Sequence, residues 1–230
     1  MDLNHILFIP DGNRRWAKKR DLKPWEGHKA GGESFKKIVE YIVKHNTVKY
    51  LSFWAMSKDN YIKRPKNEIS HLIKIINDLN IQFAKNEDIE DYGVNIRFYG
   101  SWEKIFDKKI VTGLKKVEYD TRNNKKFFLS ILLAYDGKEE LINALNSMEK
   151  GKRINEKTIK RNLWTKDLPD VDLIVRTGVN NDPHLSGNVL LWQTSYSQLY
   201  FSETFWPAFD INELKKAIND YSSRKRRRGK

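Results

Sequence analysis

The stretch His5-Ile6-Leu7-Phe8-Ile9-Pro10-Asp11-Gly12-Asn13-Arg14-Arg15-Trp16 places a short apolar run directly before an acid, a glycine, an amide and two arginines. The run His5–Ile9 predicts a buried strand, and the polar residues after it predict the start of a helix. A strand that leads into a helix is the repeating unit of α/β proteins. This first segment therefore indicates both a fold class and a place where chemistry could occur.

The same alternation continues along the 230 residues. Strand-like patterns are expected at Val48–Ala55, Val94–Phe98, Phe127–Ala134 and Val171–Val175, with short strands later in the chain. Helical apolar spacing is expected over Phe35–Ile42, Ile69–Phe83, Trp102–Val117, Leu141–Met148 and Lys157–Leu163, and from about Asn212 onward. No internal repeat or low-complexity linker is visible. We expect a single α/β domain over residues 1–230, with a mainly parallel central sheet flanked by helices.

In folds of this class, ligands bind beyond the carboxyl ends of the strands. The predicted strand ends are 11–16, 57–60, 100–102, 135–137 and 176–178, and three of these five are dense in acid, amide, hydroxyl and guanidinium groups. This concentration predicts a polar site at one edge of the sheet.

The segment Asp11–Trp16 has the composition of a diphosphate site. A glycine permits close backbone approach, a helix N-terminus offers free N–H groups, and arginines donate in pairs to phosphate oxygens. Asp11 alone would oppose an anion, but a carboxylate beside phosphates is a usual Mg²⁺ ligand. The alternative is that Asp11 caps the helix and the arginines form a solvated basic turn.

A second anion could be held by Arg176-Thr177-Gly178 and the following loop Pro183-His184-Leu185-Ser186-Gly187-Asn188. The alternative here is an ordinary surface loop. Other chemistries lack their patterns: the chain has no P-loop, no dinucleotide fingerprint, no zinc spacing and no serine nucleophile elbow. It has no cysteine, which excludes disulfides and thiolate chemistry.

The chain carries 43 Lys and Arg against 30 Asp and Glu, a formal net charge of +13. This balance leaves nucleic acid, anionic membranes and phosphorylated small molecules open as partners. The basic tail 224–230 holds six of the positive charges. Absence of cysteine, of a membrane-spanning apolar run and of a signal-peptide pattern leads us to expect a cytoplasmic protein.

Several blocks, in order and at the right spacing, resemble the cis-prenyltransferases, the undecaprenyl diphosphate synthase family. They are Ile9–Ala17, Gly27-His28-Lys29-Ala30-Gly31, Ser57-Lys58-Asp59-Asn60-Tyr61 with Arg64-Pro65, Asp172–Gly178, Leu190–Gln193, Leu199–Phe201 and Trp206-Pro207. The resemblance implies Mg²⁺-dependent condensation of isopentenyl diphosphate with an allylic diphosphate to give a cis-prenyl diphosphate. It also implies a hydrophobic tunnel for the product, lined by the helix Lys66–Ala84 and the strand Phe127–Leu133.

The resemblance also implies residue roles. Asp11 would hold Mg²⁺, and the allylic diphosphate would be held by Gly12, Asn13, Arg14, Arg15 and His28. Asn60 would lie near the proton that is lost, with Ser57 and Arg64 beside it, and Trp16 and Tyr61 would flank the prenyl groups. Asp59 is a further expected substrate-binding residue. Arg176 would hold isopentenyl diphosphate together with Ser186 and with His184, which stands near the place of a family arginine.

Two further implications concern the second half of the chain. Gln198 stands where the family has a Mg²⁺-ligating glutamate, and an amide is a weaker ligand for a hard cation. Arg227 and Gly229 in the tail resemble an element that reaches across a homodimer to the partner's diphosphate site.

Three alternatives to a chain-elongating enzyme stay open at this point. They are a short-chain or branched, lavandulyl-type synthase of the same family, a non-catalytic partner subunit, and a nucleic-acid-binding domain. The last lacks a helix-turn-helix, zinc or RNP-type signature and is suggested by charge alone, so no nucleic-acid partner is expected. The lipid-like product leaves peripheral membrane contact open.

Overall fold

The computed structural model describes residues 3–85, 91–149, 151, 153–185 and 188–224. Among these, six strands form one sheet in the order β3-β4-β2-β1-β5-β6, and every neighbouring pair is parallel. The strands are β1 (His5–Ile9), β2 (Tyr50–Ser57), β3 (Val94–Tyr99), β4 (Phe127–Tyr135), β5 (Leu173–Arg176) and β6 (Gln198–Phe201). The expected α/β class and parallel sheet are confirmed.

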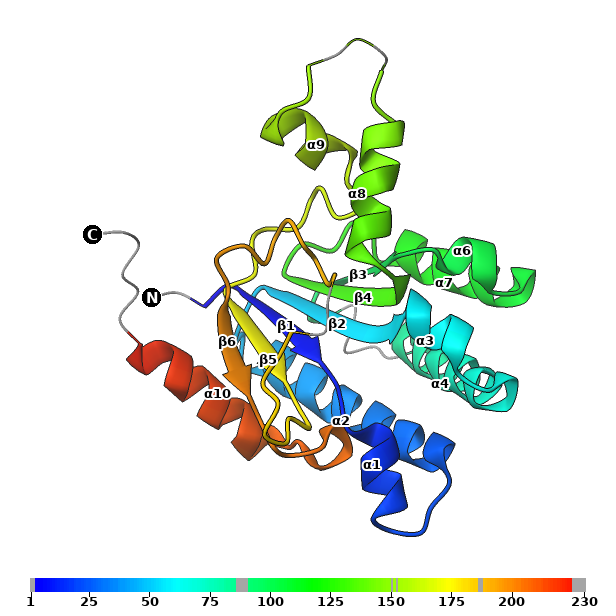
Figure 1. Cartoon of the computed structure of the whole chain (residues 1–230), viewed down its shortest axis with the longest axis vertical. Helices are drawn as coiled ribbons and strands as arrows, with labels where there is room; N and C mark the ends of the chain where they lie inside the picture. The colour runs from blue at the N-terminus through cyan, green and yellow to red at the C-terminus, as the bar shows by residue number, and fades with distance from the viewer. Residues whose placement is uncertain (1–2, 86–90, 150, 152, 186–187, 225–230) are drawn as a thin grey trace.

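The connecting helices cover the sheet on both faces (Figure 1). In chain order they are α1 (Asn13–Lys18), α2 (Pro24–Lys44), α3 (Lys58–Lys63), α4 (Lys66–Lys85), α6 (Trp102–Ile105), α7 (Lys108–Asp120), α8 (Gly137–Asn146), α9 (Glu156–Asn162) and α10 (Ile211–Ser223), with a 3₁₀ turn η1 (Trp206–Ala208). No described helix is long and apolar enough to cross a membrane.

Strand β1 shows why the sheet is buried on both faces. All five of its residues are buried, and alternate side chains enter two different cores. Ile6 and Phe8 join the larger core beneath α2, α4, α7 and α10, whereas Leu7 and Ile9 join a smaller core on the other face. A continuous apolar strand is what a sheet covered on both faces requires.

One expected helix is divided. The apolar stripe over Trp102–Val117 reads as continuous in sequence, but the structure ends α6 before Phe106 and begins α7 after Asp107. The Asp107 carboxylate accepts a hydrogen bond from the backbone N–H of Ile110 at 3.0 Å, so Asp107 caps a new helix. The expectation of one helix was wrong because the spacing of apolar residues does not reveal where a capping residue begins a new helix.

Candidate functional site

A cavity of about 1220 Å³ opens at the carboxyl ends of the strands. Its polar part is lined by residues that follow β1, β2 and β4, together with the first turns of α2. Its apolar part runs between α2, α4 and the sheet, where Phe35, Leu72, Ile75, Ile76, Leu79, Phe98 and Ile131 line it. One cavity thus joins charged groups to a long apolar pocket.

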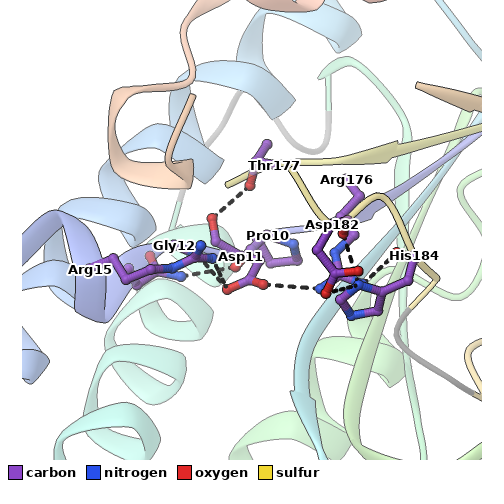
Figure 2. A network of polar contacts seen from close by, with 9 residues as sticks. Pro10, Asp11, Gly12, Arg15, Arg176, Thr177, Asp182 and His184 are labelled. Atoms are coloured by element: carbon purple, nitrogen blue, oxygen red, sulfur yellow. Dashed lines mark hydrogen bonds and ion pairs between the residues drawn. The ribbon is translucent and has the colours of Figure 1, made fainter. Parts of the chain in front are cut away.

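Asp11 lies directly after β1 and is held by three segments. Its backbone carbonyl accepts from the Thr177 hydroxyl at 2.8 Å and from the Trp206 N–H at 3.0 Å. Its carboxylate contacts the Arg15 guanidinium at 3.0 Å and the Arg176 guanidinium at 3.2 Å (Figure 2). A single acid therefore sits between two arginines that are far apart in the sequence.

Gly12 caps α1, and Asp11 does not. Gly12 has φ +102°, and a Cβ there would lie 2.6 Å from the Phe205 ring. The backbone thus adopts a conformation that favours glycine. No side-chain capping bond is present at this helix start, so the alternative in which Asp11 serves as an N-cap is wrong.

Arg176, at the end of β5, is almost completely buried. It donates to the backbone carbonyl of His184 at 2.6 Å as well as to Asp11, while its Nε has no hydrogen-bond partner among the described residues. The His184 ring itself contacts the Asp182 carboxylate at 3.0 Å. The loop after β5 is therefore fastened to the site through Arg176, and it is not a free surface loop.

A second charged cluster lies on the other side of the polar part of the cavity. The buried carboxylate of Glu68, in the first turn of α4, lies 3.1 Å from Nε2 of His28, 3.5 Å from Arg64 and 3.8 Å from Arg14. Burial, and then the charge of Arg64, lower the pKa of His28 to about 4, so its ring is neutral at pH 7. Burial also lowers the pKa of Arg64.

Glu68 was missed from the sequence, although a signal existed. The apolar stripe of α4 was read from Ile69, but Glu68 precedes Leu72 by four residues and so shares its helix face. An acid on the buried face of an amphipathic helix needs a partner, and this would have pointed to the cluster.

The structure gathers most of the expected site residues around this cavity. Those that line it are Asp11, Gly12, Asn13, Arg14, Arg15, His28, Ser57, Asp59, Asn60, Arg64 and His184. Ser57 caps α3 by accepting from the N–H of Asn60 at 3.0 Å, which brings these two together.

Three expected residues lie elsewhere. Trp16 lines a separate, smaller hollow, where the Arg20 guanidinium stacks on its ring, and Tyr61 packs against the larger core. Gln198 pairs in register with Leu173, three residues before the Arg176 end of the sheet, and its side chain accepts from Arg224 at 3.2 Å. Within one chain Gln198 therefore does not join Asp11 at a metal site. Ser186, Arg227 and Gly229 lie outside the described residues.

Residues 9–229 match the profile of the undecaprenyl diphosphate synthase family of prenyltransferases. An isoprenyl transferase of Fusobacterium nucleatum is 39% identical over 98% of this chain and 95% of its own length. A tritrans,polycis-undecaprenyl-diphosphate synthase (geranylgeranyl-diphosphate specific) of Pyrococcus furiosus is 32% identical over 98% of this chain and 86% of its own length.

Two solved structures share the fold over nearly the whole chain. Lavandulyl diphosphate synthase from Lavandula x intermedia, in complex with dimethylallyl diphosphate, superposes with a TM-score of 0.87 at 25% identity, covering 99% of this chain and 98% of that one. A probable undecaprenyl diphosphate synthase from Campylobacter jejuni gives a TM-score of 0.80 at 29% identity, with both chains fully covered.

Proposed function

This chain belongs to the undecaprenyl diphosphate synthase family of prenyltransferases, and from that premise we propose that it condenses isopentenyl diphosphate with an allylic diphosphate to give a cis-prenyl diphosphate. The observation that carries the proposal is the single cavity in which Asp11 and several arginines stand at one end and apolar side chains line the other. A prenyl diphosphate has the same division between a charged head and an apolar tail.

The allylic diphosphate would lie against Gly12, Asn13, Arg14, Arg15 and His28. Guanidinium groups stabilise the charge that develops on a leaving diphosphate, and a dry apolar wall protects a reactive allylic centre from water. The apolar part of the cavity would receive the growing prenyl chain.

Isopentenyl diphosphate would be held by Arg176 with the loop that contains His184 and Ser186. Asn60, supported by Ser57, Asp59 and Arg64, would lie near the proton that is lost when the new double bond forms. Trp16 and Tyr61 are still proposed to flank the prenyl groups, although neither residue lines the cavity within one chain.

The donor set at Asp11 fits Mg²⁺. Among the described residues no group of three or more His, Asp or Glu side chains could hold a metal ion by itself. Mg²⁺ is usually bound by one or two carboxylates together with substrate phosphates, so one aspartate beside a diphosphate site suits it. When bound, the ion would neutralise charge on the departing diphosphate.

We include a homodimer of single-domain chains, 1–230, in the proposal. The tail residues Arg227 and Gly229 would then complete the diphosphate site of the partner, and Gln198 would act only across that interface. Peripheral contact with a membrane surface would suit the lipid-like product.

The test is incubation of the purified chain with Mg²⁺, labelled isopentenyl diphosphate and dimethylallyl, geranyl or farnesyl diphosphate, followed by mass spectrometry of the products. A prenyl diphosphate longer than the allylic starter is expected. Absence of product with all three starters would reject the function.

Asp11→Asn should lower kcat by about 10³-fold, because it keeps the shape of the side chain and removes the negative charge. Asp120→Asn is the matched control: Asp120 forms an exposed ion pair with Lys116 on α7, away from the cavity, and should keep normal turnover. Equal activity of the two variants would contradict the role of Asp11.

A branched, lavandulyl-type condensation is the second candidate, favoured by the close superposition on lavandulyl diphosphate synthase. Incubation with dimethylallyl diphosphate alone separates the two candidates. A product with branched carbon connectivity would support the second candidate. No product with dimethylallyl diphosphate alone, and a linear head-to-tail product once isopentenyl diphosphate is added, would support the first. A non-catalytic subunit is set aside because the matched relatives are named as transferases and synthases.

A further inference from the structure

Glu68 ties together three separate segments at the polar end of the cavity. Its side chain is only 4% exposed, and a buried carboxylate is stable only when it is paired. Its partners are Arg14 on α1, His28 on α2 and Arg64 at the C-cap of α3. Since Glu68 itself lies on α4, one side chain contacts residues of α1 and α2 and the C-cap of α3.

Glu68 acts through these partners. It is not among the residues that line the cavity, whereas Arg14, His28 and Arg64 all line it. The distances from Glu68 to Arg64 and Arg14, 3.5 and 3.8 Å, are longer than ordinary hydrogen bonds, so the guanidinium N–H groups stay available to a ligand. Glu68 therefore contacts Arg14 and Arg64 from the side away from the cavity, and their N–H groups remain free to donate to a ligand.

Nε2 of His28 lies between two groups with opposite demands. The Glu68 carboxylate at 3.1 Å can only accept, and the Arg64 guanidinium at 3.3 Å can only donate. The carboxylate is nearer and charged, so the neutral ring carries its proton on Nε2 and donates it to Glu68. If the carboxylate were removed, Arg64 would be left as the donor to Nε2 and the ring proton would move to Nδ1.

We propose that Glu68 is a positioning residue of the phosphate site, which holds Arg14 and Arg64 beside His28 and keeps the ring proton of His28 on Nε2. This inference rests on the proposed function only in that the positioned groups are the ones assigned to the allylic diphosphate.

The first test reads the ring of His28 and needs no activity. In protein labelled with ¹⁵N-histidine, the His28 signals are assigned by their loss in His28→Gln. The wild-type ring is expected to be neutral and protonated on Nε2, and Glu68→Gln is expected to shift the proton toward Nδ1. An unchanged His28 spectrum in folded Glu68→Gln would overturn the proposal.

Glu140→Gln is the matched control, because Glu140 is an equally buried carboxylate outside the cavity. It accepts from the hydroxyl of Tyr135 and from the N–H and hydroxyl of Thr165. Glu140→Gln is expected to lower the free energy of unfolding while leaving the His28 spectrum and kcat/KM unchanged. If the His28 spectrum changed as much in Glu140→Gln as in Glu68→Gln, loss of any buried carboxylate would have the same effect on the ring, and the proposal would be overturned.

The second test is kinetic. Glu68→Gln should lower kcat/KM by about 10²-fold, since small displacements of positioning groups have effects of this size. Glu68→Asp keeps the charge but draws it back by one methylene, so it should keep the Nε2 proton and recover part of the activity. If Glu68→Gln does not fold, wild-type kcat/KM in Glu68→Asp would overturn the proposal.

The two tests separate the two proposals. If the wild-type chain makes no prenyl product, the proposed function fails, and the His28 spectrum still decides whether Glu68 positions the cluster. If the wild-type chain is active and Glu68→Gln keeps full activity and an unchanged ring, only the role of Glu68 fails.

Discussion

At the scale of single residues, the site is organised by carboxylates that each face two guanidinium groups. Asp11 lies between Arg15 and Arg176, and Glu68 faces Arg14, His28 and Arg64. Opposite charges at these distances hold long side chains in defined positions, which lowers the conformational entropy lost when a ligand binds. We infer that the free protein already holds in place the groups that are proposed to bind diphosphate.

Arg176 allows this inference to be tested by a conservative change. Its planar guanidinium donates to Asp11 and to the His184 carbonyl at once. A lysine ammonium is a single point donor on a flexible stem and cannot reproduce both contacts. Arg176→Lys should therefore lower kcat/KM by about 10²-fold.

Steady-state kinetics with isopentenyl diphosphate as the varied substrate measures this effect. Arg122→Lys is the control, because Arg122 stacks on the Tyr119 ring at the surface and does not line the cavity. If Arg176→Lys were as active as Arg122→Lys, the fork geometry of Arg176 would be irrelevant to turnover.

At the scale of helices, the close approach of α1 and α2 places His28. A Cβ on Gly27 would lie 2.1 Å from the carbonyl oxygen of Asn13, and one on Gly31 would lie 2.2 Å from the Asn13 side-chain oxygen. The backbone of Gly31 also accepts from the Trp206 indole at 2.8 Å. Glycines on one face of α2 thus let α1 and η1 pack directly against its backbone.

Neighbouring glycines of α2 should respond differently to the same substitution. Gly31→Ala would force a methyl group into Asn13 and Trp206, and should lower the free energy of unfolding by roughly 1–3 kcal/mol. Gly32→Ala would meet only side-chain carbons, at 3.3 Å from Cγ2 of Ile75 and 3.7 Å from Cδ1 of Leu79, and no backbone atom. It should be neutral or stabilise by up to about 1 kcal/mol, because alanine favours the helix.

Urea unfolding of the two variants beside the wild type measures the difference. The same stability change in Gly31→Ala and Gly32→Ala would mean that helix propensity, and not the contact with α1, governs this part of α2.

At the scale of the whole molecule, two buried histidines should make stability depend on pH. Burial lowers the pKa of both His5 and His28 to about 4. In the unfolded chain each ring titrates near its ordinary pKa of 6.5, so below that pH the unfolded state binds more protons than the folded state. The contribution of these neutral buried rings to the free energy of unfolding should therefore be complete above pH 6.5. It should decrease as the pH falls toward 4, by at most about 3 kcal/mol per histidine.

His5 offers a test that leaves the site intact. Its ring contacts the Ser52 hydroxyl at 2.8 Å and the Pro169 carbonyl at 3.0 Å, far along the sheet from Asp11. His5→Gln should be less stable than wild type at pH 7 and should lose less further stability at pH 5. Urea unfolding at both pH values checks this, and an unchanged pH slope in the variant would contradict it.

The sequence by itself determined the α/β class, the parallel sheet, and a polar site at the strand ends that includes Asp11, Arg14, Arg15 and Asn60, whereas Arg64 was expected only from the family resemblance. It could do so because apolar periodicity and strand-end composition are local properties of the chain. The element boundaries were less well predicted, as the break before Asp107 shows, because a cap is a single hydrogen bond within an apolar stripe.

Only the tertiary structure decided which charges meet. The carboxylate of Asp11 contacts Arg176 across 165 residues because β1 and β5 are neighbours in the sheet. The same topology separates Gln198 from Asp11 within one chain and brings Glu68 behind His28 and Arg64. Ion pairs depend on distances of a few ångströms, and those distances are set by strand order and helix packing, which no local pattern encodes.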